Sequence, residues 1–159
     1  MLPLCGFAQK GMRGIGVSLS YGAFFEADDA TICCLNYQKH LSDRARLSCS
    51  LGYFGTDYYG YISGVCQYHG YVEYCLIAAD VHYFFNQPRR LRPYAIGGIL
   101  FGVGDGGGYF SNVVGGVKLG LGLTYRLGYH WAMNLEVPLY WMVMETSSLL
   151  PTLGLTYTF

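Results

Sequence analysis

The chain is poor in charge, and it lacks long apolar runs. Charged residues make up 13% of its 159 amino acids, about half the share usual in a soluble domain. Ten basic and ten acidic side chains balance to a net charge of zero, which argues against a nucleic-acid partner. No uncharged apolar run approaches the roughly 18 residues that a membrane-spanning helix needs. The sequence therefore favours contact with something other than water, but not through apolar helices.

Metal-binding patterns are also missing. The six cysteines form no CxxC pair and show no metal-like spacing with histidine, so we expect neither a metal nor a cofactor. Six cysteines in an exported protein would usually suggest disulfides. With a turn at 42–45, however, antiparallel pairing places Cys33 near Tyr53 and Cys49 near Tyr37, so these two cysteines do not face each other. We interpret the cysteines as small apolar surface residues.

Residues 1–9 form a short apolar run that ends in Ala8 and Gln9, before Lys10. This resembles the tail of a secretory signal but is too short to be a whole one. The segment is either a signal-peptide remnant or a flexible amino-terminal extension. The bulky Leu4 before Cys5 disfavours a lipidated cysteine. Residues 10–159 then form a single domain.

Glycine and tyrosine are abundant, with 23 and 16 copies, and tyrosine suits an interface where one end of the ring is wet. Large apolar residues alternate with small or polar ones. The clearest case is 152–159, where one face carries Leu153, Leu155, Tyr157 and Phe159. A period of two indicates a strand with one apolar and one small, polar face.

Similar alternation recurs along the chain and predicts eight strands, at about 12–25, 30–41, 46–55, 71–85, 92–103, 113–126, 131–141 and 152–159. Short turns are expected at 42–45, 86–91 and 127–130, and long loops at 56–70 and 104–112. The segments 26–29 and 143–148 are expected to be short loops. An even number of strands can close without leaving an edge in hydrocarbon. The pattern predicts an all-β fold, an eight-stranded antiparallel up-and-down transmembrane β-barrel.

The large side chains indicate which face is outside. They share a face with Trp131 and Trp141, while Gly, Ser and Thr share the other, and glycines cannot fill the core of a soluble lipocalin-like barrel. The two tryptophans are about 33 Å apart along one strand. With a tilt of about 40°, one indole would lie near each edge of a bilayer core. We therefore predict an aromatic girdle that contains Trp131, Trp141 and Tyr157.

Residues 12–159 resemble the small eight-stranded outer-membrane β-barrels of Gram-negative bacteria, the OmpA-transmembrane-domain-like and porin-like family. The motif Thr152-x-Gly154-x-x-Tyr157-x-Phe159 looks like the signal that hands such proteins to the barrel-assembly machinery. The segments "CCLNYQKHLSDRARLSCSLGYF" and "AADVHYFF" resemble strand–turn–strand segments typical of the porin-like branch of that family. The resemblance implies a bacterial outer-membrane location, contact with membrane lipid and lipopolysaccharide, and the assembly machinery as a partner during biogenesis. We expect a monomer.

Chemistry could lie only among the inward-facing polar groups, since an eight-stranded barrel is just wide enough to be filled by side chains. We expect a polar network inside the barrel formed by His40, Asp80, His82, Lys118, Asn134 and Glu136. Lys118 and Glu136 lie on neighbouring predicted strands. In an antiparallel hairpin the residue numbers of opposite partners have a constant sum, and with a turn near 128 this sum is close to 254, the sum for Lys118 and Glu136. We therefore predict a salt bridge between them. Its role is either to satisfy buried charges or to gate ions.

Catalysis is not expected. His40 and Ser42 have a His-x-Ser spacing, and some small outer-membrane barrels modify lipid A. This pair falls in a short turn, which the topology assigns to the periplasmic side, and no other nucleophile–base pair stands out. We predict a non-enzymatic outer-membrane barrel with a structural or surface-interaction role and a filled, non-conducting interior. A narrow porin-like channel and an outer-membrane lipid-modifying enzyme are the alternatives.

The terminal aromatic residue generates a test. Removal of Phe159 should impair membrane assembly far more than the loss of one exposed side chain would in a soluble protein. The measurement is the fraction of chain that shows heat-modifiable mobility in detergent gels. An unchanged fraction would contradict a role of Phe159 in assembly.

Overall fold

The computed structural model describes residues 10–24, 27–62, 65–86, 89–105, 112–142 and 147–159. Every regular element in these ranges is a β-strand. None of the described residues forms a helix long and apolar enough to cross a membrane. In chain order the strands are β1 (Arg13–Phe24), β2 (Ala27–His40), β3 (Ala45–Ile62), β4 (Val65–Phe84), β5 (Leu91–Asp105), β6 (Val113–Arg126), β7 (Trp131–Met142), β8 (Ser147–Leu149) and β9 (Thr152–Thr158).

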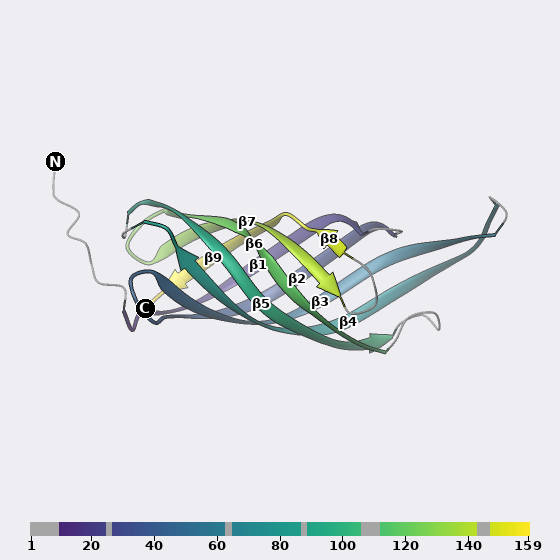
Figure 1. The fold of residues 1–159 in the computed structure, drawn as a ribbon, viewed down its shortest axis with the longest axis horizontal. Helices are drawn as coiled ribbons and strands as arrows, with labels where there is room; N and C mark the ends of the chain where they lie inside the picture. Colours follow the sequence, from purple (N-terminus) through teal and green to yellow (C-terminus); the bar gives the residue numbers. More distant parts are fainter. Residues whose placement is uncertain (1–9, 25–26, 63–64, 87–88, 106–111, 143–146) are drawn as a thin grey trace.

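All pairings are antiparallel, and the sheet closes on itself. Each strand from β1 to β7 pairs with the next, and β9 pairs with both β7 and β1. The segments β8 and β9 are two parts of one closing strand, because β8 also lies between β7 and β1. The predicted eight-stranded antiparallel barrel is confirmed, and the start of β1 and the end of β9 lie at the same end of the cylinder (Figure 1).

The predicted long loop at 56–70 is wrong. The ladder between β3 and β4 continues to the pair Ile62 and Val65, with one irregularity at Gly60 and Tyr61. The segment contains several tyrosines and Ile62, which favour strands, although the Gly and Asp residues in the same stretch are more common in loops. The hairpin therefore projects beyond the rest of the barrel, at the end opposite the start of β1 and the end of β9 (Figure 1).

Two smaller predicted loops are also shorter in the structure. β2 begins at Ala27, so most of the expected loop at 26–29 is strand. β8 begins at Ser147, inside the expected loop at 143–148, and the closing strand is interrupted at Leu150 and Pro151. Proline cannot donate to a ladder. Its carbonyl still accepts from the backbone N–H of Tyr21 at 3.2 Å, so the closing strand stays bound to β1.

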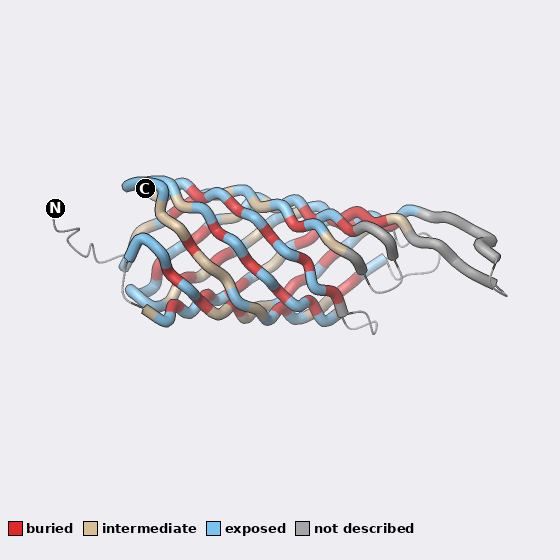
Figure 2. The backbone as a smooth tube through the Cα atoms, turned by 90° about the horizontal axis from the view of Figure 1, so that it is seen from above, coloured by how far each residue is buried: buried red, intermediate tan, exposed pale blue. Residues whose placement is uncertain are grey.

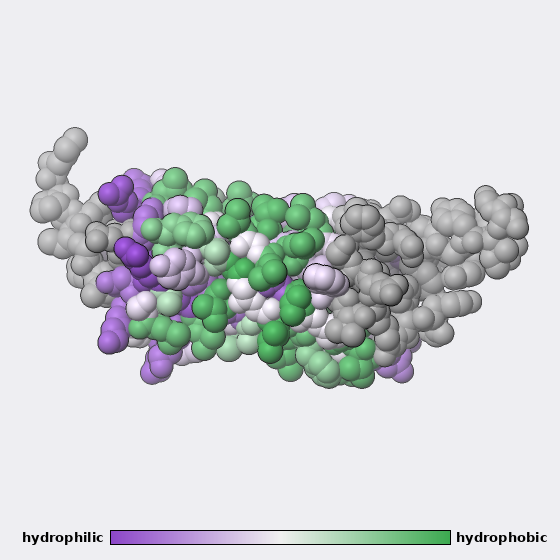
Figure 3. Space-filling model, in the orientation of Figure 1, coloured by the Kyte–Doolittle hydropathy of each residue, from purple (hydrophilic) through white to green (hydrophobic). Residues whose placement is uncertain are grey.

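Burial alternates along the strands, as Figure 2 shows. The outward positions carry large apolar side chains, and these cover the middle of the surface in Figure 3. Examples from five strands that are half exposed or more are Val17, Leu35, Ile77, Leu119 and Leu153. In water this surface would be costly at about 25 cal/mol per Å² of apolar area, whereas a bilayer core accepts it. The exterior is that of a transmembrane barrel.

Inside, glycines make room for large side chains. Gly122 pairs with Tyr94 across β5 and β6, and a Cβ on Gly122 would collide with the Tyr94 ring. Tyr94 is fully buried. β5 thus points Tyr94, Ile96 and Leu100 inward and Ile99 outward.

Candidate functional site

The middle of the interior holds a charged group of three side chains. Lys118 on β6 donates to Asp80 on β4, with Nζ to Oδ2 at 2.9 Å. The same Nζ lies 3.6 Å from Oε2 of Glu136 on β7. All three residues are at most 8% exposed. One buried cation therefore lies between two buried carboxylates.

Gly98 explains how Lys118 reaches Asp80 across an intervening strand. In the sheet, Asp80 pairs with Gly98 on β5, and Gly98 pairs with Lys118. A Cβ on Gly98 would collide with the Asp80 carboxylate. The missing side chain lets the carboxylate and the ammonium group meet over β5. The sequence places Asp80 inside the barrel but does not indicate this partner.

The predicted register between β6 and β7 is wrong. The structure pairs Lys118 with Tyr140 and Glu136 with Gly122. The residue numbers of opposite partners add up to 258, because the turn is centred on Tyr129. In this turn the backbone N–H groups of Leu127 and Gly128 both donate to the carbonyl of Trp131. The long lysine side chain spans the difference, so Lys118 and Glu136 still meet.

Hydrogen bonds from neutral side chains surround the charged group. Tyr94 donates to Oε1 of Glu136 at 2.8 Å. Asn134 accepts from Thr124 at 2.7 Å and donates to Thr156 at 2.9 Å, so its side-chain amide joins β6, β7 and β9. Buried polar groups that are paired in this way fix the barrel interior at low cost.

His40 and His82 lie apart from Lys118, in a cluster at the short-turn end. Arg46 donates from its guanidinium to Nδ1 of His82 at 2.6 Å, and the His82 ring stacks on Tyr94. The Arg92 guanidinium lies 3.9 Å from the ring centroid of Phe84, and His40 stacks on the same ring. We call this set the arginine–aromatic cluster: His40, Arg46, His82, Phe84, Arg92 and Tyr94.

The sequence reading missed Arg46 and Arg92, although the signal was present. Arg46 precedes the inward residues Ser48 and Ser50 at a spacing of two, and Arg92 stands in the same relation to Tyr94. Both arginines are almost fully buried, at 2% and 1% exposed. They enlarge the predicted polar network at one end of the barrel.

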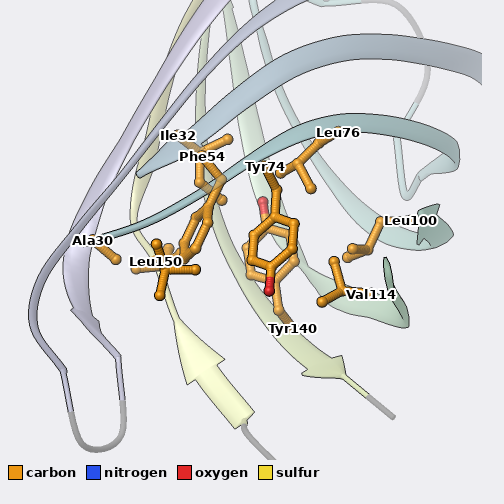
Figure 4. Close-up of a cluster of buried hydrophobic side chains, with 10 residues drawn as sticks. Ala30, Ile32, Phe54, Tyr74, Leu76, Leu100, Val114, Tyr140 and Leu150 are labelled. Carbon is orange, nitrogen blue, oxygen red and sulfur yellow. The ribbon is translucent and has the colours of Figure 1, made fainter. Parts of the chain in front are cut away.

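The opposite end of the interior is apolar. Side chains from β2 to β7, together with Leu150 between β8 and β9, converge there, with Phe54, Tyr74 and Tyr140 at the centre (Figure 4). We call this the apolar plug: Ala30, Ile32, Phe54, Val72, Tyr74, Leu76, Leu100, Val114, Tyr140 and Leu150. The sequence reading expected mainly small and polar residues inside. Those residues lie around the charged group instead, and the plug closes the barrel next to the projecting hairpin.

Little space remains between these layers. The cavity around Lys118 has a volume of about 50 Å³, enough for a few waters. A second cavity of about 20 Å³ lies beside His40 and Arg46. No cluster of three potential metal ligands occurs among the described residues. The two cavities are small, and the charged side chains around them are held in place by their neighbours.

Outside, the predicted girdle residues lie on two levels. Trp131 and Tyr157 are cross-strand partners whose rings meet edge to face, with centroids 5.2 Å apart. Trp141 is 65% exposed, ten residues further along β7. Exposed tyrosines also occur at both ends of other strands: Tyr37 and Tyr83 lie toward the short-turn end, as Trp131 does, and Tyr21 and Tyr53 lie further toward the other end.

The four residues of the predicted assembly motif divide between the two faces of β9. Thr152 points inward and shares a hydrogen bond with Ser20 at 2.7 Å. Gly154 is also buried, while Tyr157 and Phe159 are outward and exposed. Phe159 exchanges two backbone hydrogen bonds with Arg13, which extends the closing ladder.

The cross-strand partners that the turn at 42–45 predicts for Cys33 and Cys49 are confirmed. Cys33 lies opposite Tyr53, and Cys49 lies opposite Tyr37. Cys33, Cys49 and Cys75 are free thiols on the outward face. Cys34 is also free, but it packs inward against the apolar plug.

The charged group generates a test. Lys118→Met should lower the free energy of unfolding by about 3–5 kcal/mol, because it leaves two buried carboxylates without their cation. The measurement is urea unfolding of the refolded protein in detergent micelles. The triple variant Lys118→Met, Asp80→Asn, Glu136→Gln should recover most of the loss. Equal stability of Lys118→Met and the unaltered protein would show that the ion pairs are not required.

No protein-family model matches the chain, and no curated protein matches its sequence. Solved structures do match in fold. The N-terminal β-barrel domain of Pseudomonas aeruginosa OprF is 17% identical with a TM-score of 0.68, over 94% of this chain and 98% of that one. OprG from the same organism is 12% identical with a TM-score of 0.68, over 95% and 97%.

A third similar structure is Ail, the attachment invasion locus protein of Yersinia pestis, in complex with the heparin analogue sucrose octasulfate. It is 14% identical with a TM-score of 0.64, over 94% of this chain and 99% of that chain. The alignments include nearly all of each protein, so the likeness extends over the whole barrel. The chain has the fold of the small eight-stranded β-barrels of bacterial outer membranes.

Proposed function

We propose that this chain is a monomeric, non-enzymatic integral protein of the bacterial outer membrane that acts through its surface and not through a pore. The observation that carries the proposal is the filled interior. The apolar plug closes one end, Lys118 with its two carboxylates occupies the middle, and the arginine–aromatic cluster occupies the other end.

The exterior supports insertion in a bilayer. The outward apolar band lies between two aromatic levels marked by Trp131 and Trp141. Ten residues of strand tilted by about 40° span roughly 25 Å, the height of the apolar band of such barrels. The band contacts membrane lipid and, at the hairpin end, lipopolysaccharide. The assembly machinery recognises the motif that ends in Tyr157 and Phe159.

The projecting hairpin is the element for surface interaction. β3 and β4 contain 18 and 20 residues, against 12 in β1 and in β7. Exposed polar groups lie at its base, where Tyr53 donates to Glu73 at 2.6 Å. Paired strands present side chains on a stiff support, which lowers the entropy cost of binding a partner.

Recordings in planar bilayers test the filled interior. The unaltered protein should insert without steady current steps, because the plug and the charged group leave no continuous water path. Heat-modifiable mobility of the same preparation checks that it is folded. Steady steps whose ion selectivity changes in Glu136→Gln would contradict this proposal and establish the narrow channel, with Glu136 in its lining.

Epitope tags test the orientation of the hairpin. A tag inserted between Ile62 and Val65 should bind antibody on intact cells, because this hairpin faces outward. A matched tag between Asp43 and Arg44, in a short turn at the other end, should bind only after the outer membrane is permeabilised. The reverse pattern would place the hairpin in the periplasm and overturn a role in surface interaction.

A further inference from the structure

The fold separates charges that balance in the sequence. Of the ten basic residues, all but Lys118 belong to the short-turn end of the barrel. Arg46, Arg92 and Arg126 line its interior. The other six lie on the exposed rim: Lys10, Arg13, Lys39, Arg44, Arg89 and Arg90. Hydrophilic residues accordingly gather at this end in Figure 3.

Acidic residues show the opposite distribution. Asp43 is the only one at the short-turn end among the residues that the structure describes. Asp57, Glu73 and Asp105 lie toward the hairpin end, and Glu73 and Asp105 are cross-strand partners. The short-turn end is therefore strongly positive, although the whole chain has no net charge.

Two rim cations are direct neighbours. Arg13 on β1 and Lys39 on β2 are cross-strand partners, and both are exposed. Like charges directly opposite each other destabilise a sheet. Their next neighbours on the outward face are apolar: Lys39 pairs with Leu47, and Arg13 lies beside Phe159. Within the described residues, no carboxylate side chain forms an ion pair with either cation. The two side-chain cations are therefore not neutralised by an ion pair with a side chain among the described residues.

The position of the pair relates it to the bilayer. Arg13 is the next outward-facing residue after Ile15 toward the short-turn end of β1. Lys39 is the next outward-facing residue after Tyr37 toward the same end of β2. Ile15 is the cross-strand partner of Tyr157 in the aromatic level that contains Trp131. Aromatic residues of this kind mark the headgroup level of a bilayer. The Arg13–Lys39 pair therefore lies at or just beyond the headgroups and in contact with lipid.

Arg90 repeats the arrangement on the other side of the barrel. Its guanidinium lies 5.2 Å from the ring centroid of Tyr125, which continues the outward face of β6, and its Nε donates to the carbonyl of Arg126. A cation that stacks on an outward tyrosine keeps its charge at the lipid surface. Two basic sites thus lie on the same rim.

We propose that the short-turn rim binds the phosphate groups of anionic phospholipids in the leaflet that surrounds it, with Arg13, Lys39 and Arg90 as the contacting side chains. This rests on the proposed function, because it requires the barrel to lie in a bilayer. Lys and Arg side chains near an anionic leaflet are attracted to its headgroups. The rim enriches its own lipid shell in negative headgroups and holds this end at the membrane surface.

The two tryptophans of the chain allow a direct test, because one lies at each end of the apolar band. The full chain is refolded into vesicles that contain brominated phosphatidylglycerol or brominated phosphatidylcholine, whose bromines quench nearby tryptophans. Trp141→Phe reports from the short-turn rim through Trp131. Trp131→Phe reports from the hairpin end through Trp141 and is the matched control.

At Trp131, the ratio of the binding constant of phosphatidylglycerol to that of phosphatidylcholine should be at least about three. This ratio should fall toward one in 0.5 M salt. At Trp141 it should be one or less. Arg13→Gln with Lys39→Gln should remove most of the preference at Trp131, and Arg90→Gln in the exposed turn should remove part of it. Glu73→Gln, at the other end, should leave it unchanged.

Equal binding of the two lipids at Trp131, or the same preference at both tryptophans, would overturn the proposal while leaving the barrel in its membrane. Full loss of the preference in 10 mM inorganic phosphate at constant ionic strength would identify a site for soluble anions instead. Failure of brominated phosphatidylcholine to quench either tryptophan would overturn membrane insertion itself, and with it the lipid-binding rim.

Discussion

The rest of the structure depends on one constraint: each strand must find a hydrogen-bonding partner on both sides. A sheet edge in hydrocarbon would leave backbone N–H and C=O groups unpaired at a cost of several kcal/mol each. The chain meets this requirement by pairing β9 with both β7 and β1. Even the break at Pro151 keeps its contact with β1, through the carbonyl that accepts from Tyr21. Closure in turn gives every strand one face toward lipid and one toward a narrow interior.

The interior is organised in three layers, and each solves a different packing problem. Large apolar rings fill the end near the hairpin, a buried cation with two carboxylates fills the middle, and arginines on aromatic rings fill the short-turn end. Glycines opposite Tyr94 and Asp80 provide the space these side chains need. In the proposed function, this filled interior supports the groups displayed at the two ends of the barrel. One end displays a long hairpin with tyrosines and acids at its base, and the other displays a rim of basic residues beside aromatic rings.

Much of the fold follows from residues that are close in sequence. The alternation at 113–126 and 131–141 predicts β6 and β7 almost to the residue, and the turn at 42–45 gives the correct register of Cys33 with Tyr53. Prediction from the sequence fails where a residue type that is common in loops lies within a strand. Gly and Asp at 55–60 suggest a loop, yet cross-strand pairing with β4 extends the strand to Ile62. The β6–β7 register also fails, because its sum depends on a turn centred on Tyr129, whose position local alternation does not specify.

The sequence alone determined that the chain forms alternating strands, that its large side chains face lipid, and that Lys118, Asp80 and Glu136 point inward, because a period of two assigns each residue to a face. Only the tertiary structure decided which inward residues meet. Lys118 reaches Asp80 across Gly98 because three strands lie side by side, and Arg13 opposes Lys39 because β1 pairs with β2 in one register. The positive end is likewise a product of the fold. The basic residues are scattered from Lys10 to Arg126, and they come together because an up-and-down barrel brings alternate turns to the same end.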